Sequence, residues 1–458
     1  MTPQGRIAEV REGRLLFDGA DVTALAERLP TPFFLFSGRQ LRWNVESLRN
    51  TFARRHLDTE LFYASKACSN LWFLRQVHAS GINVEVNAGG ELHRALVAGF
   101  APDQIVFNGV AKTRAELREA VAAGIRAVAV DSLFELERLA GVAAALQRRA
   151  AVVLRVDVDV PTDTHPGMAT SHGGKAGIDL DDALDGFRYA AAQPWLDVRG
   201  IHLHIGSQIS EATPYVRAVE TALDVVEQAE GAIGRRLEFL DAGGGFAVPY
   251  PQTADMREDV ASLFGASRAA DDYAAAICDT LERRRPDLKL FLEPGRAVAA
   301  SAAILVSRIE NQKRKRVRDE RGTVIGEEQW LTCDAGYNTL LEHCLYDWYY
   351  PAAVASRAAE PHTAKFRLAG PLCDGGDVFV GDDGSQWRHF PAASGVGDVL
   401  AFANAGTYTL EMMQPCNAQP RAGAYAVDHG RLLEIRRRET YDDMLALDVE
   451  RRPPGLGV

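Results

Sequence analysis

The sequence predicts an α/β protein in which a (β/α)₈ TIM barrel is followed by a mostly β domain. Short apolar runs alternate with helical patterns from about residue 61 to Arg296. After Arg296 the helical periodicity gives way to short strands separated by Gly, Asp and Asn turns. Eight strands that alternate with helices over about 240 residues are typical of such a barrel, and 458 residues are too many for one ordinary domain.

The expected barrel strands are short and apolar: Leu61–Ser65, Asn83–Asn87, Ile105–Phe107, Ala127–Val130, Val152–Asp157, Arg199–Ile205, Leu237–Asp241 and Lys289–Glu293. The strands expected after the barrel are Ser301–Ile309, Gln329–Asp334, Phe366–Ala369, Val399–Asn404, Ala424–Val427 and Leu432–Glu434. Near the N-terminus, Arg14–Phe17 and Pro32–Phe36 are also typical of strands that join the β domain. We therefore expect N-terminal strands over 1–35, the barrel over 36–296 and a β-sandwich or β-barrel domain over 297–458.

Composition and charge exclude several classes of partner. The net charge of −11 argues against nucleic acid and acidic membranes, which both require a basic surface. The one basic run, Lys313–Arg316, is followed by acidic residues and is expected to be a solvated loop. No apolar stretch approaches the roughly 18 residues of a membrane span. The six scattered cysteines lack CxxC spacing, which favours reduced thiols in the cytoplasm.

Polar and glycine-rich groups follow four of the predicted barrel strands: Tyr63–Lys66, His202–Ser207, Asp241–Gly245 and Glu293–Arg296. Each group alone is weak, because a lysine after a strand is usually a surface charge and successive glycines usually form a turn. The functional groups of TIM barrels collect at the carboxyl ends of the strands. Together these residues could form an amine nucleophile, an aromatic ring, a backbone anion cradle and an acid–base pair.

Seven ordered motifs resemble those of the fold-type III pyridoxal-phosphate decarboxylases, the group of diaminopimelate, ornithine and arginine decarboxylases. They are Tyr63–Ala67, Gly90–Leu92, His202–Gln208, Gly243–Phe246, Glu293–Arg296, Cys373–Asp377 and Ala405–Tyr408, and they cover roughly residues 30 to 430. The resemblance implies an alanine-racemase-like barrel and a carboxy-lyase that uses pyridoxal 5′-phosphate to decarboxylate an amino acid.

The resemblance also implies roles for individual residues. Lys66 would bind the cofactor as a Schiff base, His204 would stack on its ring, and Glu293 would lie beside the ring nitrogen. An amine must be partly deprotonated to attack a carbonyl, and burial and neighbouring positive charge favour that form. The remaining expected cofactor ligands, most of them around the phosphate, are Ser207, Gly243, Gly244, Gly245, Gly295, Arg296 and Tyr408.

The Cys373–Asp374 loop has its own implied role. By the resemblance, Cys373 is the general acid that returns a proton to the reacting carbon, and Asp374 recognises a distal amine of the substrate. Without the neighbouring motif, Cys373 would more simply be a small buried hydrophobe. In the family this loop reaches the cofactor of the other subunit, so a homodimer with shared active sites is implied.

The substrate-reading residues depart from the diaminopimelate pattern. Diaminopimelate decarboxylases usually carry an Arg-Pro pair that binds the distal carboxylate, whereas this chain has Glu342-His343, with Tyr346 retained. An anion there should repel a carboxylate. Asp374 replaces a common Glu, and Cys416 replaces a Tyr. The expected substrate-binding residues are Arg296, Glu342, Tyr346, Asp374 and Tyr408.

These departures favour a diamino acid such as D- or L-lysine or ornithine, or a conjugated amino acid of a siderophore-like pathway. Genuine diaminopimelate decarboxylation of lysine biosynthesis and a non-catalytic homologue are alternatives, and a racemase on the same barrel is a further one. A metal-dependent amidohydrolase is the remaining rival, because His202 and His204 form an HxH pair. That pair belongs on the first strand of such enzymes, whereas here it lies on the sixth, so no metal is expected.

Overall fold

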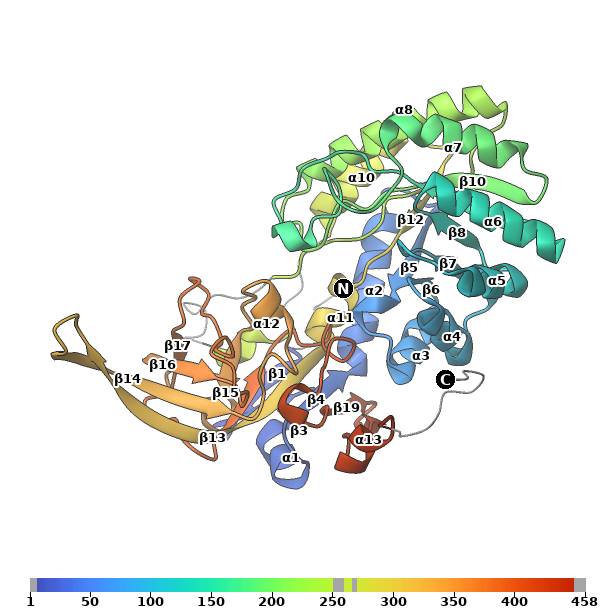
Figure 1. The fold of residues 1–458 in the computed structure, drawn as a ribbon. Helices are drawn as coiled ribbons and strands as arrows, with labels where there is room; N and C mark the ends of the chain where they lie inside the picture. Colours follow the sequence, from blue (N-terminus) through green and yellow to red (C-terminus); the bar gives the residue numbers. More distant parts are fainter. Residues whose placement is uncertain (1–5, 250–258, 266–269, 449–458) are drawn as a thin grey trace, which may run out of the picture.

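The computed structural model describes residues 6–249, 259–265 and 270–448. Its two parts are a closed parallel barrel and a mostly β unit beside it (Figure 1). The barrel strands are neighbours in chain order: β5 (Thr59–Ala64), β6 (Asn83–Val86), β7 (Ile105–Phe107), β8 (Ala127–Val130), β9 (Ala150–Arg155), β10 (Leu196–His202), β11 (Phe239–Asp241) and β12 (Lys289–Leu292). This confirms the predicted barrel and its β companion. The division of the chain at residues 35 and 296 stays a prediction.

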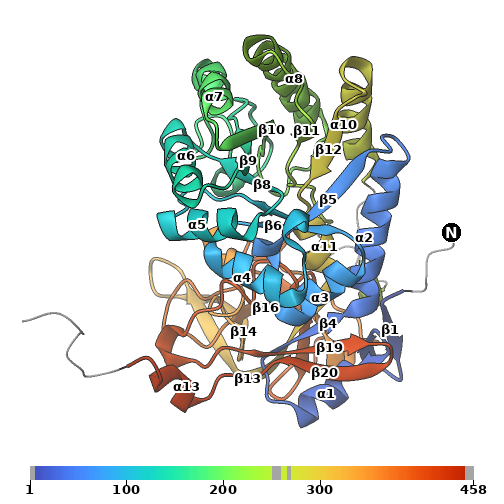
Figure 2. The same cartoon turned by 90° about the vertical axis from the view of Figure 1, so that its right-hand side faces the viewer.

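Amphipathic helices surround the barrel (Figure 2): α2 (Gly38–Ala53), α3 (Leu71–Ala79), α4 (Gly89–Ala98), α5 (Arg114–Ala123), α6 (Leu133–Leu146), α7 (Leu180–Ala192), α8 (Thr213–Ile233) and α10 (Asp271–Arg284). Helix α5 shows how the sequence sets the ends of such a helix. Thr113 and Glu116 form a reciprocal capping box at its start, and Gly124 ends it with φ +74°. Leu117 and Val121 lie on its buried face.

The mostly β unit is a nine-stranded sheet whose main path runs β17-β16-β14-β13-β4-β19-β20, with β15 and β18 off this path. Its strands are β4 (Phe33–Ser37), β13 (Ala303–Arg318), β14 (Val324–Cys333), β15 (Ala352–Val354), β16 (Ala364–Ala369), β17 (Arg388–Phe390), β18 (Val399–Phe402), β19 (Gly423–Asp428) and β20 (Arg431–Arg436). Strand β4 pairs with β13 and β19, so the N-terminal segment 32–36 completes this sheet as predicted.

Arg14–Phe17 is a strand beside the β unit, as predicted, but it does not pair with the nine-stranded sheet. This segment is β2, which pairs with β1 (Ala8–Arg11) and β3 (Ala20–Asp21) in a separate three-stranded sheet. Gly13 and Gly19, with φ near +80°, turn the chain back twice, so the hydrogen bonds stay local. Phe17 shares a hydrophobic cluster with Phe33 and Ile304, so the small sheet packs against the β unit instead of extending it.

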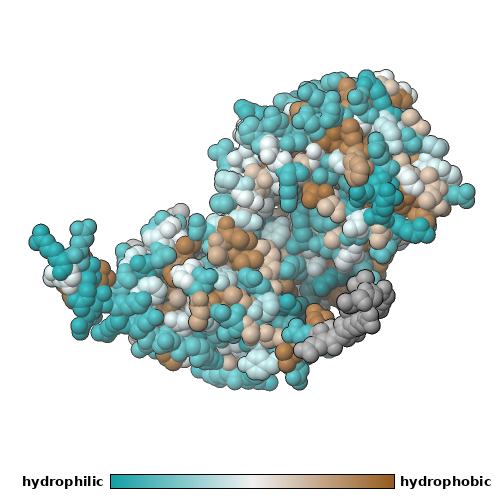
Figure 3. Space-filling view, viewed as in Figure 1, coloured by the Kyte–Doolittle hydropathy of each residue, from teal (hydrophilic) through white to brown (hydrophobic). Residues whose placement is uncertain are grey.

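The prediction of a solvated loop at Lys313–Arg316 is wrong. The run lies in β13, whose pairing with β14 forms a long hairpin that projects into solvent as a hydrophilic arm (Figures 1 and 3). Cross-strand pairs of opposite charge, such as Lys315 with Glu328, favour the strand. Among the described residues, no helix is long and apolar enough to cross a membrane.

Candidate active site

A cavity of about 470 Å³ opens where the barrel rim meets the β unit. Barrel residues supply one wall, and residues after β14 and β18 supply the other. Seven of the site residues predicted from the sequence line it: Lys66, His204, Ser207, Arg296, Glu342, Tyr346 and Tyr408. The barrel topology therefore brings together groups that are far apart in the sequence.

Lys66 follows β5 in a single 3₁₀ turn, Ser65–Ala67. Burial alone lowers the pKa of an ammonium, but the charges of Glu85, Tyr408 and Glu293 raise the pKa of Lys66 above its ordinary value. The expectation that burial and positive neighbours favour the neutral amine is therefore not met. The acidic neighbours outweigh both effects, so the lysine needs a proton acceptor before it can act as a nucleophile.

Glu85 is a suitable acceptor that the sequence analysis missed. It lies in β6 between two valines and is fully buried, and within the described chain neither carboxylate oxygen has a hydrogen-bond partner. Burial raises the pKa of Glu85 to about 8, although the Lys66 charge opposes this. A charged residue inside an apolar strand could have identified Glu85 from the sequence. Arg155 in β9, which lines the cavity, could have been identified in the same way.

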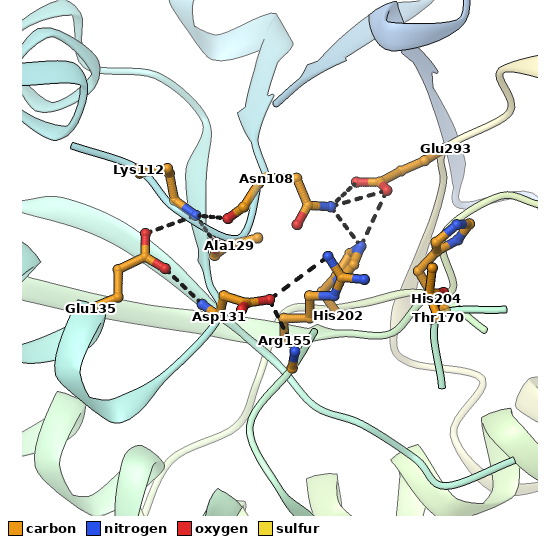
Figure 4. Close-up of polar contacts among 12 residues, drawn as sticks. Asn108, Lys112, Ala129, Asp131, Glu135, Arg155, Thr170, His202, His204 and Glu293 are labelled. Carbon is orange, nitrogen blue, oxygen red and sulfur yellow. Dashed lines mark hydrogen bonds and ion pairs between the residues drawn. The ribbon is translucent and has the colours of Figure 1, made fainter. Parts of the chain in front are cut away.

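Glu293 follows β12 and lies within a buried polar cluster (Figure 4). Its Oε2 lies 3.2 Å from Nε2 of His202 and 3.3 Å from Nδ2 of Asn108. Burial favours protonation, but His202, Lys66 and Arg155 hold the pKa of Glu293 below its ordinary value. Burial and the Glu293 charge raise the pKa of Asp241 well above its ordinary range. Glu293 is thus the anion of this pair, which suits a position beside a protonated ring nitrogen.

The same cluster is relevant to the alternative of a metal-dependent amidohydrolase. His202, Asp241 and Glu293 present ligand atoms that all lie within 4.8 Å of one another, a spacing that could hold a metal ion. However, the side-chain nitrogen of Asn108 lies 2.9 Å from Nε2 of His202, the atom that also faces Glu293. Of the two histidines of the HxH motif, only His202 belongs to this cluster, and His204 lines the cavity.

His204 is fixed from two sides. Its Nδ1 accepts a hydrogen bond of 3.3 Å from the backbone N–H of Gly244, and its carbonyl accepts one of 2.8 Å from the Thr170 hydroxyl. Burial, followed by the charges of Lys66 and Arg155, places the pKa of His204 well below its ordinary value. The imidazole is therefore neutral and can lie against a flat ring without adding charge.

The turn Gly243–Gly245 follows β11 and packs tightly against its neighbours. A Cβ on Gly244 would lie 2.1 Å from the Glu293 carbonyl oxygen, and one on Gly245 would lie 2.1 Å from that of Gly206. Only glycine fits here, and the N–H groups of Gly243 and Gly244 donate to Asp241 at 2.9 Å and to His204 at 3.3 Å, which fixes the turn. With the Lys66 amine, the Glu293 anion and the Ser207 hydroxyl, the donor set fits pyridoxal 5′-phosphate. Gly295 allows close packing next to Lys66, because a Cβ at this position would lie 3.1 Å from the Cβ of Ala67.

Arg296 and Glu342 form a buried ion pair that the sequence did not predict. Arg296 opens α11 (Arg296–Ala299) and Glu342 opens α12 (Glu342–Leu345). Nη1 of Arg296 donates to Oε2 of Glu342 at 3.1 Å, and Nη2 donates to Oε1 at 2.7 Å. The exposed fractions are 3% and 2%. Both terminal nitrogens of Arg296 are committed to this carboxylate, so the two residues expected to read substrate neutralise each other.

Aromatic side chains and one hydroxyl surround this pair. The guanidinium of Arg296 lies 4.6 Å from the Trp348 ring and 4.9 Å from the Tyr408 ring. Tyr350 donates to Glu342 at 3.2 Å, and Nε of Arg296 lies 3.4 Å from the Ser207 hydroxyl. Tyr408 and Ser207 therefore both lie next to Arg296.

Two predicted residues, Cys373 and Asp374, do not line this cavity. Both are exposed on the loop after β16. The N–H of Cys373 donates to Asn417 at 2.8 Å, and the Asp374 carboxylate accepts from the Tyr337 hydroxyl at 3.0 Å. The same hydroxyl lies 3.5 Å from the Cys416 thiol. Within one chain, this loop is therefore held outside the site.

The chain matches known proteins over nearly its whole length. Residues 39–300 match the pyridoxal binding domain of pyridoxal-dependent decarboxylases. A diaminopimelate decarboxylase from Archaeoglobus fulgidus is 32% identical over 97% of this chain and 99% of that protein. One from Neisseria meningitidis is 37% identical over 93% of this chain and 96% of that protein. The crystal structure of the M. jannaschii diaminopimelate decarboxylase with L-lysine superposes with a TM-score of 0.82 at 29% identity, over 98% of both chains.

These matches extend through the segments that carry Lys66, the glycine turn and Glu293. The likeness therefore covers the segments that carry the residues fitting the cofactor, as well as the architecture. The chain belongs to the pyridoxal-dependent decarboxylases, and it is a carboxy-lyase that uses pyridoxal 5′-phosphate to decarboxylate an amino acid.

Proposed function

We propose that this decarboxylase acts on an amino acid whose distal end is an amine or a neutral group, such as lysine, ornithine or a conjugated amino acid. The observation that carries the proposal is the buried pair between Arg296 and Glu342. A guanidinium held on both terminal nitrogens by one carboxylate has little attraction left for a second. A distal carboxylate would also meet the charge of Glu342.

Decarboxylation of meso-diaminopimelate is the second candidate, and the comparisons favour it over the substrate that the sequence suggested. The relatives at 32% and 37% identity are diaminopimelate decarboxylases. For this substrate, Arg296 would have to leave Glu342 and bind the distal carboxylate instead. The L-lysine in the M. jannaschii structure supports an amino-acid ligand in this cavity under either candidate.

The residues of the cavity divide the work of the reaction. When bound, the cofactor supplies a conjugated ring that accepts the electron pair left by departing CO₂. Lys66 would hold it covalently after passing a proton to Glu85, which can accept one in its ionised form, the form favoured above its pKa of about 8. Glu293 would keep the ring nitrogen protonated, and His204 would lie against the ring. Ser207 and the amides of the glycine turn would bind the phosphate.

We further propose a homodimer in which each subunit completes the site of the other. Cys373 and Asp374 are exposed and lie outside the cavity of their own chain, which supports this arrangement. Cys373 of one subunit would return a proton to the reacting carbon, and Asp374 would pair with the distal amine of the substrate.

The substrate proposal is tested with the purified, cofactor-loaded protein. We expect CO₂ release and an amine product from lysine, ornithine or their conjugates, with both enantiomers supplied, and weak release from meso-diaminopimelate. Release from meso-diaminopimelate that equals or exceeds the best diamino acid would overturn the proposal in favour of the second candidate.

The dimer proposal is tested by mixing two inactive variants, Lys66→Ala and Cys373→Ala. Random exchange of subunits should restore about a quarter of the native activity, because half of the dimers are mixed and each has one intact site. A matched mixture in which Cys344→Ala replaces Cys373→Ala controls for a thiol loss outside the proposed site. No recovery in the first mixture, with subunit exchange verified, would contradict shared sites.

A further inference from the structure

A second pocket, of about 280 Å³, lies apart from the catalytic cavity. It is lined by the start of α3, by α4 and by the end of β20. Figure 2 shows these barrel helices facing the β20 edge of the β unit. Three of its lining residues are basic or can become so: His93 and Arg94 from α4, and Arg436 from β20.

Arg436 carries a charge without a carboxylate partner. It is half-buried, its Nε is buried without a hydrogen-bond partner, and within the described residues it forms no ion pair. Burial, followed by the charge of Arg421, lowers the pKa of Arg436. Leaving a partly buried cation unpaired is unfavourable. This position therefore calls for an anion.

Arg94 faces the same pocket. Its Nη1 donates to the carbonyl and the hydroxyl of Ser69, at 3.1 and 3.0 Å, and across 6–249, 259–265 and 270–448 it has no ion-pair partner. Arg421 adds a third positive charge to this region, but it is already paired with Glu439 at 3.0 Å. Two guanidinium groups thus share one small pocket, and among the described residues neither has a carboxylate within ion-pair distance, although Glu439 and Glu411 act on Arg436 from farther away.

We propose that this pocket binds a small oxyanion, a phosphate or a carboxylate, between Arg94 and Arg436. Guanidinium groups bind both anions through short charge-assisted hydrogen bonds. The anion would offset the repulsion between the arginines and satisfy the unpaired Nε. Because Arg94 belongs to the barrel and Arg436 to the β unit, the anion would also connect the two parts, beside the existing bond from Asn70 to the Ile435 carbonyl.

The pocket lies next to both segments that supply the catalytic cavity. Ser69, which Arg94 contacts, is three residues after Lys66, and its N–H donates to Glu411 at 2.6 Å. Glu411 is three residues after Tyr408, whose N–H donates to the Ala67 carbonyl at 2.8 Å. An anion held by Arg94 therefore stabilises the neighbourhood of the cavity without entering it.

The test uses the full chain loaded with pyridoxal 5′-phosphate, so that the cofactor's own phosphate site is filled. Inorganic phosphate is titrated against potassium chloride of equal ionic strength, and calorimetric binding and the unfolding temperature are measured. We expect phosphate to bind and to raise the unfolding temperature beyond the salt control. Arg436→Gln should weaken binding roughly tenfold or more. Arg431→Gln, an exposed arginine on the same strand, should leave it unchanged.

Equal affinity of Arg436→Gln and Arg431→Gln for the anion that binds would overturn the proposal, and so would the lack of any effect of phosphate or succinate beyond that of chloride. If Arg436→Gln does not fold, Arg94→Gln takes its place, and native affinity in that variant would overturn it equally. Succinate in a parallel titration separates the sources: tighter binding of succinate indicates a carboxylate, and tighter binding of phosphate indicates a phosphate. Failure of both anions to bind contradicts the site.

Discussion

The two ends of the catalytic cavity arrange their charges in opposite ways. At the cofactor end, Lys66 lies among Glu85 and Glu293, yet within the described residues it has no ion pair within 4.0 Å. At the distal end, Arg296 and Glu342 are joined by two hydrogen bonds and are almost fully buried. A lysine amine can lose its proton to a base that comes within hydrogen-bond distance, whereas an arginine guanidinium stays charged in a protein. The first end thus keeps a titratable amine near two carboxyl groups, and the second end holds its charges in a fixed pair.

The largest effect is expected from removing the Lys66 amine at the cofactor end. Lys66→Ala should lower kcat for the best substrate by about a thousandfold or more, because the other described lysine that lines the cavity, Lys175, is exposed and does not follow a barrel strand. The measurement is CO₂ release together with the visible absorbance of the bound cofactor. Lys289→Ala, at the surface start of β12, is the control and should keep both signals. A variant at Lys66 with near-native activity would refute its role.

The distal end can be altered while the cofactor end stays intact. Glu342→Gln removes the negative charge but keeps a hydrogen-bonding side chain, which leaves Arg296 able to attract a carboxylate. We expect the ratio of kcat/KM for meso-diaminopimelate to that for lysine to rise about tenfold or more. The change should lie mainly in KM, because the residue reads the substrate and does not touch the reacting carbon.

A matched control for that variant is Tyr350→Phe, which deletes one hydrogen bond to Glu342 and keeps both charges of the pair. It should leave the substrate ratio close to the native value. If Glu342→Gln and Tyr350→Phe give the same ratio, the pair is a packing element, and diaminopimelate becomes the better assignment.

The sequence predicted the cofactor end far better than the distal end. Lys66 and the glycine turn stand in short motifs, since covalent attachment and anion binding each need particular residues at fixed positions. Glu85 and Arg155 were missed because their direction depends on strand register inside the barrel. The Arg296–Glu342 pair joins residues 46 positions apart. The sequence showed the reversed charge at Glu342, but only the fold shows which cation it meets.

The smallest expected effect concerns stability and pH at the cofactor end, through Glu85. Burial raises the pKa of Glu85 to about 8 in the folded protein, whereas the unfolded chain has the ordinary value of about 4.5. Between these values the folded state binds more protons than the unfolded state. The free energy of unfolding contributed by Glu85 is therefore fully present below pH 4.5 and is lost as pH rises towards 8.

Glu85→Gln, which is neutral at every pH, should remove this loss. Urea unfolding of the cofactor-free protein between pH 5 and 8 should show the native free energy of unfolding falling relative to that of the variant. The difference should grow by about 1 kcal/mol per pH unit. Glu119→Gln, at an exposed position of α5, is the control and should parallel the native curve. If Glu85→Gln also parallels the native curve, the pKa of Glu85 is not raised in the folded state, and its carboxylate is a weaker base towards Lys66 than proposed.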